Sequence, residues 1–336
     1  MIFGKMRAIG DTARSNLMFY LWVMWHPRYR ELAHKYGQLK NPLTEYRRVL
    51  PKQGYYFCSF HSHKNSRSLE EVARVARQRG LDICFIMDHD SDDKFGIDML
   101  KHYQFPEGQI YLVKGIECRC KDNRLLAKPK RTKMLFAMYD GVIEPNQPLI
   151  ETVRRANAQR ALIIPTTTLH TGTSGGISKR DINILMSDPD TRINAIETLD
   201  AGYGFVHKYI NRHYWACAVA EHIANQYGLP VIWSSNDHID EEMGVAGNFI
   251  LKKDLPCLEH PDILMKNPRI LREQLRNTFK RRAVMPVGYY SPALSFMKHK
   301  RRKIIQEDTG DSLKRKGEDL ADIGRNLKDL LKGDTH

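Results

Sequence analysis

The sequence predicts an α/β barrel in the middle of the chain, with an extension at each end. Between Tyr55 and Ile250, short β-type runs alternate with helix-type stretches, which is the pattern of βα units built around parallel strands. Eight such runs occur, and this number favours closure of the strands into a barrel. The excess positive charge of the chain lies outside this region, at the two ends.

Each predicted strand is a short run dominated by apolar and β-branched residues. The eight runs are Tyr55–Phe60, Asp82–Met87, Ile110–Ile116, Met134–Tyr139, Ala161–Pro165, Ile193–Thr198, Pro230–Ser235 and Val245–Ile250.

The first crossover helix has a clear beginning and end in the sequence. Ser68 is followed three residues later by Glu71, which is the spacing of a capping box. Leu69, Val72, Ala73 and Ala76 then mark one apolar face, and Gly80 ends the helix.

The chain divides into an extension at residues 1–50, a barrel domain at 51–290 and a tail at 291–336. Residues 1–50 contain 9 Lys and Arg against 3 Asp and Glu, residues 261–336 contain 18 against 10, and residues 51–260 contain 26 against 26. The formal charge of +14 therefore predicts that an anionic lipid surface or a nucleic acid binds the ends. The oligomeric state is left open.

Two segments of the ends are distinctive. The tail begins with a basic cluster and continues with leucines and isoleucines at the spacing of an amphipathic helix. The longest apolar run of the chain, Leu17–Trp25, is too short to cross a bilayer. The six cysteines include no CxxC pair, which indicates a reducing compartment. We expect a cytoplasmic protein, with peripheral binding to a membrane as an alternative. The basic cluster consists of Lys298, Lys300, Arg301, Arg302 and Lys303.

A histidine pair follows the first predicted strand. His61 and His63 are two residues apart, so in an extended segment both imidazoles project to the same side. Two imidazoles on one side can bind one metal ion at the carboxyl end of the strands. Two surface histidines in a loop are the alternative.

Four further predicted strands are followed by histidine or carboxylate side chains. Because the carboxyl ends of parallel strands open onto the same mouth of a barrel, we expect these side chains to converge with His61 and His63 into a metal site. The additional ligand candidates are His89, Glu117, His170, Asp237 and His238.

The order of these motifs resembles that of the PHP (polymerase and histidinol phosphatase) family of metal-dependent phosphoesterases. The similarity covers roughly residues 55–250 and includes the segments that connect the motifs. The sequence SLEEVARVARQRGLDICFIMDHDS is similar to a helix and the second motif of the family, and EHIANQYGLPVIWSSNDH to its last helix and strand. INAIETLDAG is similar to an Ile-Glu segment of the family. The motifs themselves are His61-x-His63, Asp88-His89, Gly115-Ile116-Glu117, His170 and Ser235-Asn236-Asp237-His238.

The resemblance implies a distorted (β/α)7 barrel with divalent zinc, manganese or iron at its mouth. His61, His63 and Glu117 would hold one ion, Glu117 and His170 a second, and His89 and His238 a third. The implied reaction is hydrolysis of a phosphate ester by a metal-activated hydroxide, with His61, His63, Glu117, His170 and His238 as catalytic residues.

The sequence departs from the family pattern at three ligand positions. No ligand follows the His61-x-His63 motif, Lys133 stands where a histidine is expected, and Asn236 aligns with the usual aspartate. We therefore expect one or two ions, with the closest set at His61, His63 and Glu117.

Four cationic side chains lie near the predicted mouth and are candidates for binding the phosphate of a substrate. Solvated surface charge is the alternative for each. They are Lys64, Arg67, Arg119 and Lys133.

Two other functions remain open beside the phosphoesterase. The missing ligands favour a binding or scaffold protein that engages an anionic partner through its basic ends. An HxH motif with later His and Asp also occurs in amidohydrolase-like enzymes, although no lysine stands at an evident metal-bridging position.

Overall fold

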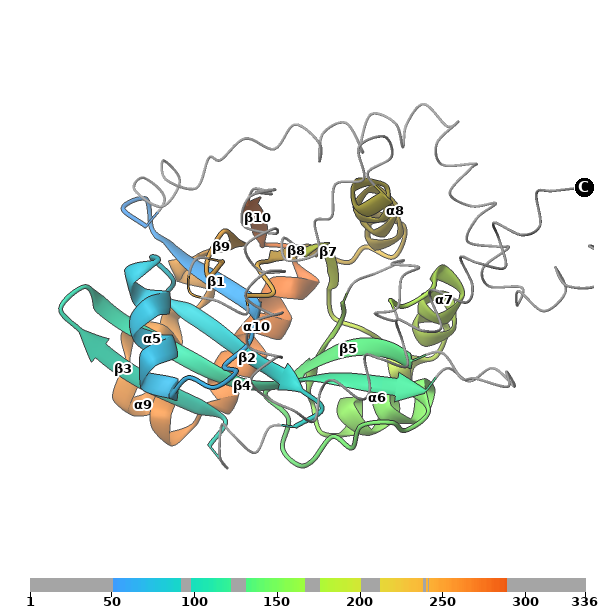
Figure 1. Ribbon diagram of the computed structural model, residues 1–336, viewed down its shortest axis with the longest axis horizontal. Helices are drawn as coiled ribbons and strands as arrows, with labels where there is room; N and C mark the ends of the chain where they lie inside the picture. The colour runs from blue at the N-terminus through green and yellow to red at the C-terminus, as the bar shows by residue number, and fades with distance from the viewer. Residues whose placement is uncertain are drawn as a thin grey trace, which may run out of the picture. The chain divides into compact units, whose positions relative to one another are not determined.

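The computed structural model describes residues 51–91, 98–121, 131–166, 176–200, 212–237, 240 and 242–288 (Figure 1). The predictions for the N-terminal extension, the basic cluster and the tail fall outside these residues. So do the predicted ligands His170 and His238.

The strands form one mixed sheet and one small parallel sheet. Within the described residues the order of the larger sheet is β10-β9-β1-β2-β4-β5-β6, with β3 paired to β4, and the smaller sheet pairs β7 with β8. The bounds are β1 Tyr55–Ser62, β2 Ile83–His89, β3 Leu100–Phe105, β4 Gly108–Lys121, β5 Arg131–Ala137, β6 Leu162–Pro165, β7 Ile196–Asp200, β8 Val231–Ser234, β9 Ala246–Leu251 and β10 Met285–Gly288.

The prediction of a (β/α)7 barrel of the PHP type is wrong. Strands β1, β2 and β4 are parallel, but β4 pairs antiparallel with β3 and β5, β5 with β6, and β1 with β9. The larger sheet forms half of a barrel, and its strands do not alternate one by one with helices. Antiparallel neighbours need only a short connection, so consecutive strands such as β3 and β4 form a hairpin without a crossover helix.

The positions of the strands were predicted better than their directions. Each of the eight predicted runs overlaps an observed strand, although Met134–Tyr139 is shifted toward Arg131 and Ile193–Thr198 toward Asp200. Strands β3 and β10 were missed, because Leu100–Phe105 is largely polar and Met285–Gly288 contains a proline. A run of β-type residues does not encode the direction of the strand, and this is where the prediction failed.

The helix between β1 and β2 matches the prediction. Helix α5 spans Leu69–Gln78, and the Ser68 side chain accepts a hydrogen bond from the Glu71 backbone while the Glu71 side chain accepts one from the Ser68 backbone. The capping box is thus confirmed. Val72, Ala73 and Ala76 are buried, and Gly80 has a φ of 85°, which favours glycine at the end of a helix.

One hydrophobic core lies between the sheet and three helices, α6 Leu149–Ala158, α7 Lys179–Ser187 and α8 Arg212–Gln226. Strands β4 and β5 contribute alternate residues to this core, and the helices contribute the facing apolar side chains. A short 3-10 turn, Pro189–Thr191, joins α7 to the segment before β7.

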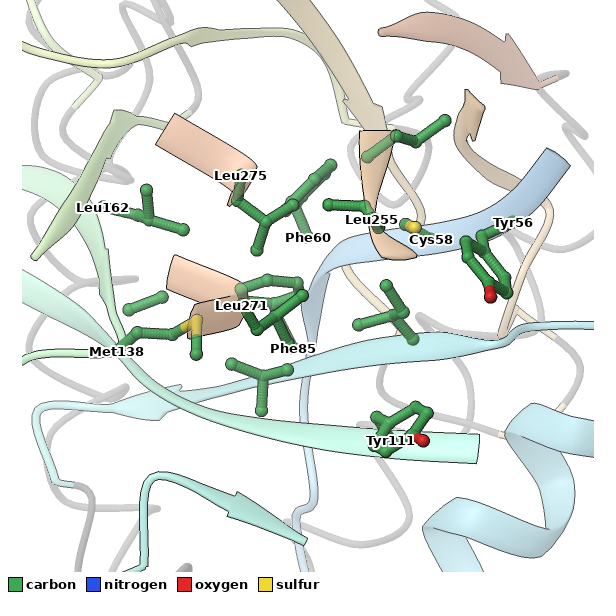
Figure 2. Close-up of a cluster of buried hydrophobic side chains, with 14 of the residues drawn as sticks. Tyr56, Cys58, Phe60, Phe85, Tyr111, Met138, Leu162, Leu255, Leu271 and Leu275 are labelled. Atoms are coloured by element: carbon green, nitrogen blue, oxygen red, sulfur yellow. The ribbon is translucent and has the colours of Figure 1, made fainter. Parts of the chain in front are cut away.

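A second core lies on the opposite side of β4 and β5. The 3-10 turns Lys252–Asp254 and Pro256–Glu259 and helices α9 Pro261–Lys266 and α10 Arg269–Lys280 close it. Figure 2 shows Leu271 and Leu275 of α10 beside Phe60 and Phe85. The Phe60 ring lies 4.8 Å from that of Phe85 and 5.4 Å from that of Phe279, measured between centroids. This dense apolar packing forms the floor below the candidate site.

No helix in the described part of the chain is long and apolar enough to cross a membrane. All six cysteines are buried and none forms a disulfide. Burial raises the pKa of both Cys84 and Cys257 to about 12, so these thiols stay protonated at neutral pH.

We expect the thiols to react with an aromatic disulfide reagent at pH 8 only after unfolding, because a buried, protonated thiol is a poor nucleophile. The number of cysteines that react before and after addition of guanidinium, measured from the aromatic thiol that the reagent releases, checks this. Rapid reaction of Cys84 or Cys257 in the folded protein would contradict it.

Gly247 on β9 lies close against β1. A Cβ at this position would lie 2.7 Å from the Phe57 ring and 2.8 Å from the Cys58 carbonyl oxygen, which is backbone and cannot rotate away. We expect Gly247→Ala to lower the free energy of unfolding by about 1–3 kcal/mol. Urea unfolding followed by circular dichroism measures this. Val142→Ala, at a side chain that is 71% exposed, is the control and should change the free energy of unfolding little. An unchanged unfolding midpoint for Gly247→Ala would contradict the prediction, because it would mean that β9 and β1 accommodate the added methyl group without loss of stability.

Candidate metal centre

A layer of polar side chains lies at one edge of the second core. Along five strands and the residues directly adjoining them, a polar side chain lies two residues from the last core-facing apolar residue, on the side toward this edge. Side chains two residues apart share a face of the sheet. The apolar and polar residues are, in pairs, Met87 and His89, Leu135 and Lys133, Ile164 and Thr166, Ala195 and Glu197, and Ile232 and Ser234.

Glu117 lies on the same face of β4 as Val113 and Gly115, two residues beyond Gly115. Its carboxylate is completely buried. The Met87 side chain and the Phe136 carbonyl oxygen lie so close to Gly115 that a Cβ atom there would collide with them. The small residue leaves room for the Met87 side chain beneath the carboxylate.

Strand β1 reaches this layer through an irregularity. Ser59 pairs with Cys84 but Ser62 pairs with Ile86, so β1 contains one residue more than β2 between these positions. An extra residue reverses the alternation of side chains, which is the usual effect of a β-bulge. Phe60 continues the core-facing series of Tyr56 and Cys58, and the extra residue places His61 and His63 in the polar layer on the same side as Phe60.

The three ligand atoms of His61, His63 and Glu117 form a compact triangle. His61 Nε2 lies 3.2 Å from His63 Nε2 and 3.9 Å from Glu117 Oε2, and His63 Nε2 lies 3.7 Å from Glu117 Oε2. Tetrahedral ligands with zinc bond lengths of about 2.0–2.1 Å are separated from one another by about 3.4 Å. The donor set and its spacing therefore fit a divalent ion, and in the described residues this is the group that does so.

A second buried carboxylate fixes the orientation of His61. The Glu197 Oε1 atom lies 2.9 Å from His61 Nδ1. A carboxylate only accepts, so Nδ1 carries a proton whether the ring is neutral or charged. In the neutral ring the Nε2 lone pair points into the triangle, and in the protonated ring the positive charge stabilises the two carboxylates. The Thr166 and Ser234 hydroxyls donate to the same carboxylate. Such a carboxylate behind a histidine is the arrangement that orients metal-binding imidazoles.

Both buried carboxylates are held in the ionised form. Burial alone would raise the pKa of Glu117, but the hydrogen bond from His89 and the charges of Lys133, His89 and His61 outweigh it and hold this pKa well below its usual range. Burial likewise opposes ionisation of Glu197, and the charge and hydrogen bond of His61, with the donors Ser234 and Thr166, lower the pKa of that carboxyl.

The partners of Glu117 divide between its two oxygens. Lys133 Nζ lies 2.7 Å from Oε1, and the His89 Nδ1 contacts Oε2, which also faces the triangle. The ring of His89 packs against that of His63 with 4.5 Å between centroids. Since the His89 side chain is 47% exposed, it marks the solvent side of the centre.

Asn236 completes the surroundings of His63. Its Oδ1 atom lies 2.9 Å from His63 Nε2, and its φ of 45° is a left-handed conformation that asparagine tolerates better than most residues. An amide oxygen only accepts, so in this contact His63 Nε2 carries a proton, which a bound ion would replace. The same oxygen is a further candidate ligand atom beside the triangle.

The other predicted site residues are placed differently. Asp237 is buried, and its Oδ2 atom lies 3.8 Å from Arg67 Nη2, while its carbonyl accepts the backbone N–H of His63. The Arg67 guanidinium bonds Asp240 at 2.6 Å and the carbonyls of His63 and Lys64. These residues brace the segment after β1.

Of the two remaining candidates for phosphate binding, Arg119 is held by its side chain and Lys64 by its backbone. Arg119 forms an ion pair with Asp90, whose carboxylate also accepts the Arg119 backbone N–H. The backbone N–H of Lys64 bonds Asp88 at 3.0 Å. Among the four predicted cations, Lys133 forms an ion pair with the Glu117 carboxylate of the triangle, whereas Arg67 contacts the triangle through the backbone carbonyl of His63.

Sequence reasoning missed Glu197, Thr166 and Ser234 as site residues. The Ile-Glu segment was noted only for its resemblance to a family. Counting by twos from the apolar residues of each strand would have found them, because Ile164, Ala195 and Ile232 are each followed two positions later by a polar residue.

No protein-family model matches the chain, and no curated protein matches it. Among solved structures, the chain is partly similar to one described as the crystal structure of PsfC from Pseudomonas syringae PB-5123, with a TM-score of 0.42 and 14% sequence identity. The similarity covers 59% of this chain and 82% of that chain. A similarity at this level carries no argument about function, so the resemblance to the PHP family stays a prediction from the sequence.

Glu197 should make the free energy of unfolding depend on pH. Its pKa is lower in the folded than in the unfolded chain, so its contribution is complete above the unfolded value of about 4.3 and is lost as the pH falls toward the folded value. We expect the difference in unfolding free energy between wild type and Glu197→Gln to shrink between pH 7 and pH 3.5.

Urea unfolding at several pH values measures this difference. Glu107→Gln, at an exposed side chain, is the control and should track the wild type. A difference that stays constant across the range would mean that Glu197 is not ionised in the folded protein.

Proposed function

We propose that this protein is a metal-dependent hydrolase of phosphate esters. The observation that carries the proposal is the buried triangle of His61, His63 and Glu117, in which Glu197 holds the His61 lone pair toward the other two ligand atoms. A cluster of this kind in a water-poor layer is costly to bury unless a cation or a network of donors compensates it.

One divalent ion, zinc, manganese or iron, is the expected occupant. When bound, such an ion supplies Lewis acidity toward a phosphoryl oxygen and toward water. The residues of the chain contribute the rest: Glu197 keeps His61 in the tautomer that can bind, and the buried floor beneath Glu117 excludes water.

Cationic side chains favour an anionic substrate. Lys133 lies at the triangle, and Arg119, directly opposite it on β4, is 43% exposed. Fixed positive charges around a partly buried site attract phosphate groups and strengthen at low local dielectric. This favours phosphate esters over amides as substrates.

The place of the protein in the cell is part of this proposal. Phosphorylated small molecules, and a reducing environment for six cysteines that form no disulfide, fit a cytoplasmic enzyme. The basic ends of the sequence would then bring it to an anionic lipid surface or a nucleic acid.

The test begins with metal binding. We expect purified full-length protein to retain or take up about one tightly bound zinc, manganese or iron ion, and His61→Ala with His63→Ala to abolish binding, because two of three ligands are lost. Metal analysis after equilibrium dialysis measures this. His260→Ala removes an exposed histidine far along the chain, near α9, and should leave binding unchanged.

A substrate panel then separates the reaction classes. Hydrolysis of phosphate esters that depends on the added ion, with no hydrolysis of amides, would support the proposal. A folded wild type that takes up no ion, or an ion that remains in the double variant, would contradict it. Amide hydrolysis alone would favour the amidohydrolase-like alternative.

A further inference from the structure

The ammonium of Lys133 lies against the same carboxylate that completes the metal triangle. Lys133 is on β5, and its Nζ atom is 2.7 Å from Glu117 Oε1, while Glu117 Oε2 faces His61 and His63. The lysine side chain is only 12% exposed. One buried carboxylate therefore stands between a candidate ion site and a fixed positive charge.

The neighbouring cation is neutralised differently. Arg119 and Lys133 are directly opposite each other on β4 and β5, and like charges at such positions repel. Arg119 forms its ion pair with Asp90, which does not belong to the triangle. Lys133 is paired with Glu117, and a bound ion would share that carboxylate. Binding of an ion would thus leave net positive charge at Lys133.

A lysine in this place also limits the number of ions. An ammonium has three donors and no lone pair, so it cannot be a ligand while protonated. A second divalent ion on Oε1 would lie within a few ångströms of Nζ and be repelled by it. The position beside the Lys133 ammonium, next to the Glu117 carboxylate, is therefore suited to an anion.

We propose that the centre holds a single divalent ion and that Lys133 takes the place of a second, so that a phosphoryl group binds between the ion and the Lys133 ammonium. This inference rests on the proposed function and adds to it the number of ions and a substrate-binding residue. Charge-assisted hydrogen bonds from lysine to phosphate are strong, and a strand residue is held in place by the sheet.

The experiment compares the binding of inorganic phosphate to metal-loaded variants. Full-length wild type, Lys133→Gln, Lys133→Arg and Lys101→Gln are each loaded with zinc, and the bound metal is counted. Lys101 on β3 is the matched control, because its ammonium pairs with Asp98, which does not belong to the triangle. Phosphate affinity is then measured by calorimetry.

We expect one ion per chain in the wild type and a phosphate affinity that falls roughly 10–100-fold in Lys133→Gln, the loss of one charge-assisted hydrogen bond. Lys133→Arg keeps the charge and should stay within a few-fold of wild type, as should Lys101→Gln. A purely structural role for Lys133 would change the stability of the protein but not the phosphate affinity of the folded, loaded chain.

A second measurement uses the wild type alone and does not depend on the folding of a variant. Phosphate should slow the acetylation of Lys133 in the zinc-loaded protein and leave that of Lys101 unchanged, as read by mass spectrometry. Two ions bound at Glu117, unchanged phosphate affinity in Lys133→Gln, or no protection of Lys133 would each overturn this inference. A chain that binds no ion at all would instead remove the proposed function, and this inference with it.

Discussion

The buried carboxylate of Glu117 is the interaction on which the centre depends. Moving a carboxylate out of water costs several kcal/mol unless neighbouring donors and charges compensate it. Here the compensation comes from separate strands: His61 and His63 belong to β1, His89 to β2 and Lys133 to β5. The negative charge of Glu117 on β4 therefore interacts with side chains of three other strands, which also pack together through the hydrophobic core. Loss of any one of these partners would leave the buried carboxylate less well compensated.

Glu197 repeats this constraint on the other side of His61. The imidazole lies between two buried carboxylates, with Nδ1 2.9 Å from Glu197 and Nε2 3.9 Å from Glu117. Because Glu197 receives the Nδ1 proton, the ring presents its lone pair to the triangle before any ligand arrives. Preorganisation of this kind lowers the cost of binding, since the donor atoms need little rearrangement. Phe60, Phe85 and the leucines of α10 belong to the apolar core next to this layer (Figure 2).

The sequence predicted the strands and the helix cap well, and the topology poorly. The run Asp82–Met87 is apolar and short, so its strand was visible, and the spacing of Ser68 and Glu71 identified the start of α5. The direction of β5 was not visible, because its pairing with β4 and β6 depends on contacts between residues distant in sequence. Strand direction is a property of tertiary packing, and local patterns carry little information about it.

The three residues that could hold an ion were predictable from the sequence, but some of the side chains that contact them were not. His61, His63 and Glu117 follow strand positions that the pattern places at one edge. The bulge in β1 that brings His61 and His63 to the same face as Glu117 leaves no mark in the sequence. The contact of Lys133 with Glu117 follows from the antiparallel register of β4 and β5, in which Lys133 faces Arg119. Lys133 precedes the predicted strand Met134–Tyr139, so a parallel strand would have placed it at the end away from the mouth. Its predicted place near the mouth therefore did not follow from the predicted barrel and is explained by the antiparallel direction of β5.

X-ray absorption at the zinc edge of the loaded, full-length protein tests the central claim most directly. We expect one zinc per chain with a first shell of nitrogen and oxygen at about 2.0–2.1 Å and the multiple-scattering signature of two imidazoles. A spectrum with sulfur ligands, or one without imidazole scattering, would show that the ion is held elsewhere and that His61, His63 and Glu117 are not its ligands.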